Sequence, residues 1–176
     1  MTDPLTVLGL PTDRNSSYLR GPAKAPATIR EAMFSDMGHL TAQDGTDLAP
    51  DFAGFRDLAL QESERDHAAI EAGAADAFAR GAALFVGGDH YVTWPILMGL
   101  KAAMRPAPHI VHFDAHSDTY PDYDGNRFSH ASPFARILES GLCASLTQVG
   151  VRTLNAVQQG QVERYGVRVA HPDEIA

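Results

Sequence analysis

Two short segments of the sequence place histidine and aspartate directly after apolar runs. The first is GGDH at 87–90, which follows the apolar run 82–86, and the second is DAHSD at 114–118, which follows the run 109–113. Asp114 and His116 are two residues apart, so their side chains share a face while the chain remains extended. Asp118 joins them if the extension persists or if the loop curls back. His90 would enter from the end of the neighbouring strand.

Such a cluster has the composition of a site for a divalent cation. Two imidazoles and two carboxylates suit Mn²⁺, Fe²⁺ or Zn²⁺, whereas Ca²⁺ and Mg²⁺ prefer shells made only of oxygen. GGDH alone is equally typical of a turn with a hydrogen-bonded histidine. Burying two aspartates and a histidine at one strand end, however, is costly without a compensating cation. Taken together, the two segments predict a metal site with His90, Asp114, His116 and Asp118 as ligands.

The segments that would carry these residues alternate between strand-like and helix-like patterns. The continuous apolar run 82–86 predicts a strand buried on both faces, and 109–113 predicts another, with Phe113 in the core. Residues 35–54 are polar and predict a loop, and Thr28 with Glu31 has the spacing of a capping box at the start of a helix. The remaining predicted strands are 6–10, 146–151 and 167–170, and the predicted helices are 55–80, 94–103, 133–140 and 156–165.

This alternation predicts parallel βαβ units with helices on both faces of the sheet, in one α/β domain over residues 1–176. Because functional groups gather at the carboxyl ends of parallel strands, the two histidine–aspartate segments would meet at one sheet edge. His171 and Asp173 also have ligand-like spacing, but their setting favours a loop at a strand end. Loop chemistry also explains Ser17 and its neighbours better than a substrate pocket does.

Composition narrows the classes of partner. The 176 residues are 44% hydrophobic and 20% charged, as in a globular protein, and their formal net charge is −8. This acidic surplus repels phosphate backbones and anionic lipid, so we expect neither nucleic acid nor a membrane surface as partner. Cys143 is the single cysteine and cannot form an internal disulfide. The sequence shows no secretory signal and no run of about 20 apolar residues, so we expect a cytoplasmic protein.

GGDH at 87–90 and DAHSD at 114–118 resemble the two N-terminal metal-binding motifs of the ureohydrolases, the family of arginase and agmatinase. The similarity continues in segments 8–33, 125–142 and 146–155. The segments NSSYLRGPAKAP and GNRFSHASPFARI are most similar to the plant-arginase-like branch. The resemblance implies a three-layer αβα fold with a parallel sheet, of which this chain holds the N-terminal part.

The resemblance also assigns roles to individual residues. His90 and Asp118 would be terminal ligands of one Mn²⁺, His116 a terminal ligand of a second, and Asp114 a bridge between the two ions. His130 would shuttle protons or assist the departing amine, although Ala131 follows it where the family usually has glycine. The implied reaction splits a small guanidino substrate, arginine or agmatine, into urea and an amine by attack of a metal-bridging hydroxide. A homo-oligomer, trimer or hexamer, is implied as well.

The family's downstream Ser-x-Asp-x-Asp-like element does not occur before Ala176. The resemblance therefore implies that this segment is inactive in isolation. Two other hypotheses stay open. One is a catalytically silent ureohydrolase-like module with a partial metal site that acts by binding a partner. The other keeps the same ligands but hydrolyses acyl amides.

Overall fold

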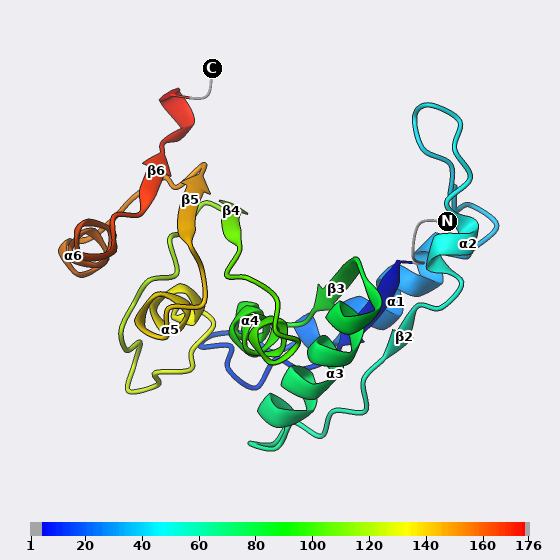
Figure 1. Ribbon diagram of the computed structural model, residues 1–176, viewed down its shortest axis with the longest axis horizontal. Coiled ribbons are helices and arrows are strands. Elements are labelled where there is room, and N and C mark those ends of the chain that lie inside the picture. The colour runs from blue at the N-terminus through cyan, green and yellow to red at the C-terminus, as the bar shows by residue number, and fades with distance from the viewer. Residues whose placement is uncertain (1–4, 175–176) are drawn as a thin grey trace.

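The computed structural model, which describes residues 5–174, contains two three-stranded sheets in which every pair of strands is parallel (Figure 1). The strand orders are β2-β1-β3 and β4-β5-β6. The strands are β1 Thr6–Leu10, β2 Arg56–Asp57, β3 Ala83–Gly87, β4 His109–Phe113, β5 Ser145–Val149 and β6 Arg168–Ala170. The α-helices are α1 Ala25–Met33, α2 Ala49–Phe52, α3 Asp66–Arg80, α4 Thr93–Ala102, α5 Pro133–Glu139 and α6 Ala156–Tyr165. The expected α/β class, with helices flanking parallel strands, is confirmed.

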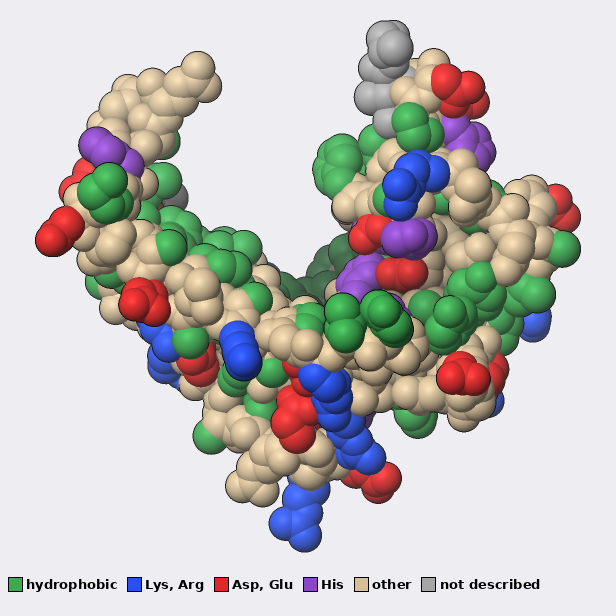
Figure 2. Space-filling view, turned by 180° about the vertical axis from the view of Figure 1, so that it is seen from behind, with side chains coloured by type: hydrophobic (Ala, Val, Ile, Leu, Met, Phe, Trp, Pro, Cys, Tyr) green, Lys and Arg blue, Asp and Glu red, His purple; other side chains and the backbone are tan. Residues whose placement is uncertain are grey.

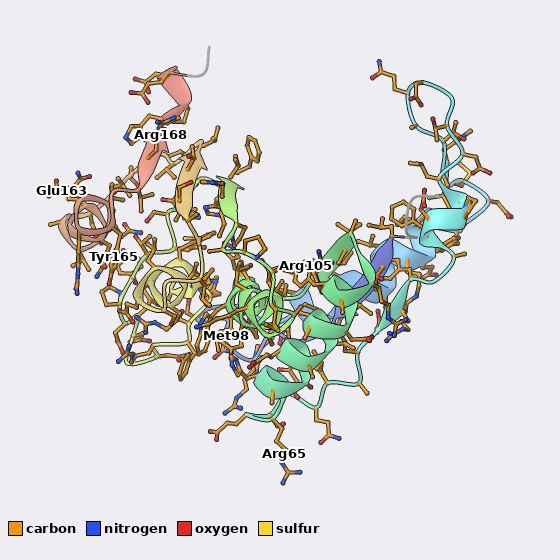
Figure 3. All side chains as sticks on the ribbon, in the orientation of Figure 1. Arg65, Met98, Arg105, Glu163, Tyr165 and Arg168 are labelled. Carbon is orange, nitrogen blue, oxygen red and sulfur yellow. The ribbon has the colours of Figure 1, made fainter. Side chains whose placement is uncertain are left out.

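The two sheets form the arms of a V, with helix α4 near its vertex (Figure 1). Helix α4 contributes to both cores. Ile96 packs with Leu10, Ile70 and Val92 in the first arm, whereas Met98 extends toward α5 in the second (Figure 3). The second core is built on a larger set of buried side chains: Phe134, Ile137, Leu142, Leu146, Val162 and Val167. Helix α4 therefore links the cores of the two arms.

Strands β3 and β4 are not hydrogen-bonded to each other, and each is an edge of its sheet. Leu84 of β3 is 39% exposed, and Val111 and Phe113 of β4 are 58% and 77% exposed. Figure 2 shows the molecule hollowed between the arms, with histidine and acidic side chains gathered on one arm beside the hollow. The prediction that both strands are buried on both faces is wrong, as is the placement of Phe113 in the core, because nothing in residues 5–174 covers these edges.

Three local predictions are also wrong. Helix α1 begins at Ala25, with Pro26 in its first turn, so Thr28 lies inside the helix and does not cap it. Residues 55–65 are not helical, because Arg56 and Asp57 pair with the edge of β1 and the helix begins only at Asp66. The predicted loop 35–54 contains the short helix α2. By contrast, the bounds of β4 and α6 match their predicted ranges.

Among residues 5–174, we find no helix with the length and apolar character that crossing a membrane requires.

The uncovered edges predict self-association of the isolated chain, because an open strand edge with exposed apolar side chains pairs readily with another chain. Replacing Val111 and Phe113 together by lysine should shift the chain toward monomer in size-exclusion chromatography with light scattering. Met37→Lys is the matched control, since Met37 is 93% exposed but lies outside the strands. Equal effects of the control and the double variant would contradict this prediction.

Candidate metal centre

The turn after β3 places His90 by means of a glycine and a buried carboxylate. A Cβ on Gly88 would lie 1.8 Å from the carbonyl oxygen of Thr12, so this position accepts only glycine. Asp89 is buried and accepts hydrogen bonds from the backbone N–H groups of Asn15, at 2.8 Å, and of Tyr91, at 3.0 Å. Burial raises the pKa of the Asp89 carboxyl to about 6, although both hydrogen bonds favour its ionised form. The turn therefore starts a short 3₁₀ helix with His90 as its first residue.

The segment after β4 curls back instead of remaining extended. Asp114 Oδ1 accepts the backbone N–H of His116 at 2.8 Å, which starts the turn. Asp118 then adopts a left-handed backbone with φ of 50°, uncommon for a residue other than glycine and typical of functional sites. Ser117 is fully buried: its carbonyl accepts from Gln148 Nε2 at 2.6 Å and its hydroxyl accepts from Gln158 Nε2 at 3.0 Å. These two glutamines hold the curl from beneath.

The curl brings the predicted ligands together. His90 Nδ1 lies 2.6 Å from Asp118 Oδ2, and His116 Nδ1 lies 3.4 Å from Asp114 Oδ1. All four side chains and His130 line one cavity of about 660 Å³. Neighbouring donor atoms that each lie about 2.1 Å from one ion are about 3 Å apart at right angles. Each of the two donor pairs is therefore spaced roughly as two ligands of one divalent cation would be. His90 thus lies next to Asp118, and His116 next to Asp114.

His112 also faces this cluster, although it is not one of the predicted ligands. Its Nε2 lies 3.6 Å from Asp114 Oδ2, and one donor atom of each of His112, His90 and Asp114 lies within 4.8 Å of the others. Burial and the nearby His90 ring lower the pKa of His112 to about 4, so the ring is neutral at ordinary pH. A signal was present in the sequence, since His112 precedes Asp114 by two residues on the same strand face.

His130 is held by the loop that follows β1. Its backbone N–H donates to the carbonyl of Asn15 at 3.1 Å, and its Nε2 is hydrogen-bonded to the hydroxyl of Ser17 at 2.8 Å. Asp13 fixes this loop by accepting the backbone N–H of Gly21 at 2.6 Å. Ser17 lines the cavity with His130, although the sequence analysis favoured ordinary loop chemistry for it.

His171 and Asp173, which follow β6, do not reach the cavity. His171 Nδ1 is hydrogen-bonded to the carbonyl of Val151 at 2.8 Å, and Asp173 lies in a 3₁₀ helix of residues 172–174. Neither side chain lines the cavity.

The loop between Asp118 and His130 is anchored to helix α5 by Arg136. This guanidinium is 4% exposed, and its Nη1 donates to the carbonyls of Pro121 at 3.0 Å and Arg127 at 3.2 Å. Its Nη2 donates to Glu139 at 2.8 Å. One buried cation therefore fixes two points of the loop that leads from one candidate ligand to the candidate proton donor.

Comparison with known proteins assigns this chain to a family. The family model described as Arginase family matches residues 3–176, and the chain belongs to that family. The arginase of Medicago truncatula, named as mitochondrial, is 35% identical over 174 residues, which cover 92% of this chain and 51% of the relative. N(1)-aminopropylagmatine ureohydrolase of Thermus thermophilus is 32% identical over 158 residues, which cover 86% of this chain and 52% of the relative.

Solved structures show the same relation. The arginase structure from Medicago truncatula superposes with a TM-score of 0.85 at 32% identity and covers 96% of this chain and 56% of its own. Proclavaminate amidino hydrolase from Streptomyces clavuligerus gives a TM-score of 0.78 at 28% identity, covering 98% of this chain and 59% of its own. The chain spans about half the length of the curated relatives it matches, and it corresponds to an N-terminal segment of them.

Arg136→Lys should lower the free energy of unfolding by about 1 to 2 kcal/mol, because lysine cannot reach both loop carbonyls and leaves one of them without its donor. Denaturant unfolding followed by circular dichroism measures the change. Arg127→Lys is the control, since the Arg127 side chain is 61% exposed and contacts the same Glu139. A loss of stability as large in the control would show that the loop anchor is not the cause.

Proposed function

We propose that this chain supplies the first half of the metal site of an enzyme that hydrolyses a guanidino compound into urea and an amine. One observation carries the proposal: His90, Asp114, His116 and Asp118 converge with His130 on one cavity in a chain of the arginase family. On this proposal residues 1–176 form the N-terminal part of a single ureohydrolase domain.

The donor set favours Mn²⁺ as the cofactor, with two ions in the complete site. His90 and Asp118 would hold one ion, His116 the other, and Asp114 would bridge them. When bound, such ions supply hydroxide near neutral pH by lowering the pKa of a water molecule. Asp114 and His116 are the only protein ligands that this chain offers the second ion within residues 5–174. We therefore expect weak binding there and little activity from the isolated segment.

The residues of this chain would also handle the proton that the reaction needs. The departing amine must gain a proton, and an imidazole suits that task because it exchanges protons near neutral pH. His130 lies in the cavity wall, with its backbone fixed by Asn15 and its Nε2 bonded to Ser17. Ser17 can therefore pass a proton between His130 and the solvent-facing side of the cavity.

The substrate class follows from the names of the relatives only as far as the guanidino group. One relative is named as an arginase, another as an N(1)-aminopropylagmatine ureohydrolase and a third as a proclavaminate amidino hydrolase. Arginine and agmatine both stay candidates. A trimer or hexamer and a cytoplasmic location stay predictions, and several plant relatives are named as mitochondrial.

A second candidate function is a catalytically silent module that binds a partner. The open edges of β3 and β4, with Phe113 77% exposed, favour it because such edges accept another chain. The protein expressed from its intact gene separates the two functions. Metal-dependent urea release from arginine, agmatine or guanidinobutyrate supports the enzyme. A manganese-loaded product that releases no urea from any of the three compounds rejects it.

Asp114→Asn should weaken Mn²⁺ binding to the isolated chain at least about tenfold, because a neutral amide replaces the carboxylate proposed as the bridge. Isothermal titration with MnCl₂ measures the dissociation constant. Asp122→Asn is the matched control, since Asp122 caps a turn by accepting the Gly125 N–H, which an amide oxygen also does. If both variants bind Mn²⁺ like the unmodified chain, the carboxylate at 114 is not a ligand.

His130→Asn should lower kcat for urea release by the intact gene product by about 10²- to 10⁴-fold while its manganese content stays unchanged. Asparagine keeps polarity at this position but cannot exchange a proton near neutral pH. His39→Asn serves as the control because His39 is exposed and does not line the cavity. Loss of manganese together with activity would instead make His130 a ligand.

A further inference from the structure

His112 has the position of a metal ligand but a different pattern of hydrogen bonds. It lies within 4.8 Å of donor atoms of His90 and Asp114, so distance alone would make it a third ligand of a shared ion. A histidine can coordinate a metal only through a ring nitrogen that carries no hydrogen. The role of His112 therefore depends on which of its two nitrogens is protonated.

The amide of Gln148 fixes the protonated nitrogen. Gln148 Nε2 lies 2.6 Å from the carbonyl oxygen of Ser117, which can only accept, so this amide atom is the NH₂ nitrogen. The same nitrogen lies 3.1 Å from His112 Nδ1. Because an amide nitrogen donates and does not accept, Nδ1 must be the acceptor. The neutral His112 ring then carries its hydrogen on Nε2 and has no lone pair there for a metal ion.

The fold holds this arrangement rigidly. The register of β4 with β5 places His112 directly opposite Gln148, and both side chains are buried. Ser117 and Phe134 are buried as well, and the Phe134 ring packs against the His112 ring with centroids 4.4 Å apart. A buried ring packed on one side and bonded at Nδ1 is not free to turn and exchange its two nitrogens.

The protonated nitrogen faces Asp114. His112 Nε2 is buried and has no hydrogen-bond partner among residues 5–174, yet Asp114 Oδ2 lies 3.6 Å away. A closure of a few tenths of an ångström makes this contact a hydrogen bond. Asp114 Oδ1 already accepts the His116 N–H. With one hydrogen bond on each oxygen, the carboxylate keeps a lone pair on each oxygen for metal ions.

We propose that His112 is a positioning residue, which donates its Nε2–H to Asp114 and orients that carboxylate for metal binding without coordinating the metal itself. Donors in this second layer fix ligand orientation and typically change metal affinity by about 10- to 100-fold. The inference deepens the proposed function and rests on its metal site. What it adds to the proposed function is that His112 carries its hydrogen on Nε2 and that its ring does not coordinate the metal.

Nitrogen NMR of the chain with ¹⁵N-labelled histidine tests the tautomer directly, and the signals of His112 are identified by their loss in His112→Gln. In the metal-free chain we expect Nε2 to be protonated and Nδ1 to be unprotonated. On addition of Zn²⁺, a diamagnetic probe, the ring nitrogens of His90 and His116 should move to coordinated positions while those of His112 do not. A protonated Nδ1, or a coordinated Nε2 of His112, overturns the inference.

Affinity for Mn²⁺ gives a second readout that does not need activity. His112→Leu removes the donor and should raise the dissociation constant about 10- to 100-fold. His112→Gln places an amide N–H near the same point and should stay within about threefold of the unmodified chain. Equal weakening in both variants overturns the positioning role. If the unmodified chain binds neither Mn²⁺ nor Zn²⁺, the proposed metal site fails, whatever tautomer His112 shows.

Discussion

The candidate site depends on bringing together the carboxyl ends of two strands that share no hydrogen bond. His90 follows β3 in the first sheet and Asp118 follows β4 in the second, yet their donor atoms lie 2.6 Å apart. Helix α4 makes this possible, because it begins three residues after His90 and contributes to the cores of both arms (Figure 1). Phe134 of α5 packs against the rings of His90 and His112 and completes the connection.

Each loop that carries a candidate residue is held by a buried polar group. Asp89 fixes the turn before His90, Ser117 fixes the curl that carries Asp118, and Arg136 fixes the loop that leads to His130. Hydrogen bonds are electrostatically strong in such low-dielectric surroundings, and a buried polar group is costly when it lacks a partner. These networks therefore specify the geometry of the loops, which the strands alone do not determine. A site for small ions requires such fixed loop geometry.

The sequence predicted the parts of the fold that depend on local chemistry. Helix α6 starts at the predicted residue because Asn155 and Gln158 form a reciprocal capping box, and β4 matches its apolar run. The start of α1 was missed because proline in a first turn outweighed the Thr28 pattern. The two residues of β2 were missed because only their pairing with β1 makes them a strand. Such a pairing leaves almost no periodicity in the sequence.

The candidate site was predictable to a similar degree. The spacing of Asp114 and His116 on one chain end indicated a shared centre, and the structure places both beside His90 and Asp118. His112 was missed because its role depends on Gln148, which lies 36 residues away and meets it only through the register of β4 with β5. Ser17 was missed for the same kind of reason, since its partner His130 is 113 residues away.

Strands β3 and β4 lack apolar cover at the same place where the proposed site has few ligands. Both strands have sequences typical of burial on two faces, yet their facing edges are open and Phe113 is largely exposed. Within residues 5–174, the proposed second ion would have only Asp114 and His116 as ligands. Further strands in the gap, parallel to β3 and β4, would cover the open edges, and their carboxyl ends would lie at the cavity. Such strands would supply apolar cover and would be placed to carry further ligands to the proposed site. For this reason, covering these edges is expected to change both the stability of the fold and the chemistry of the site.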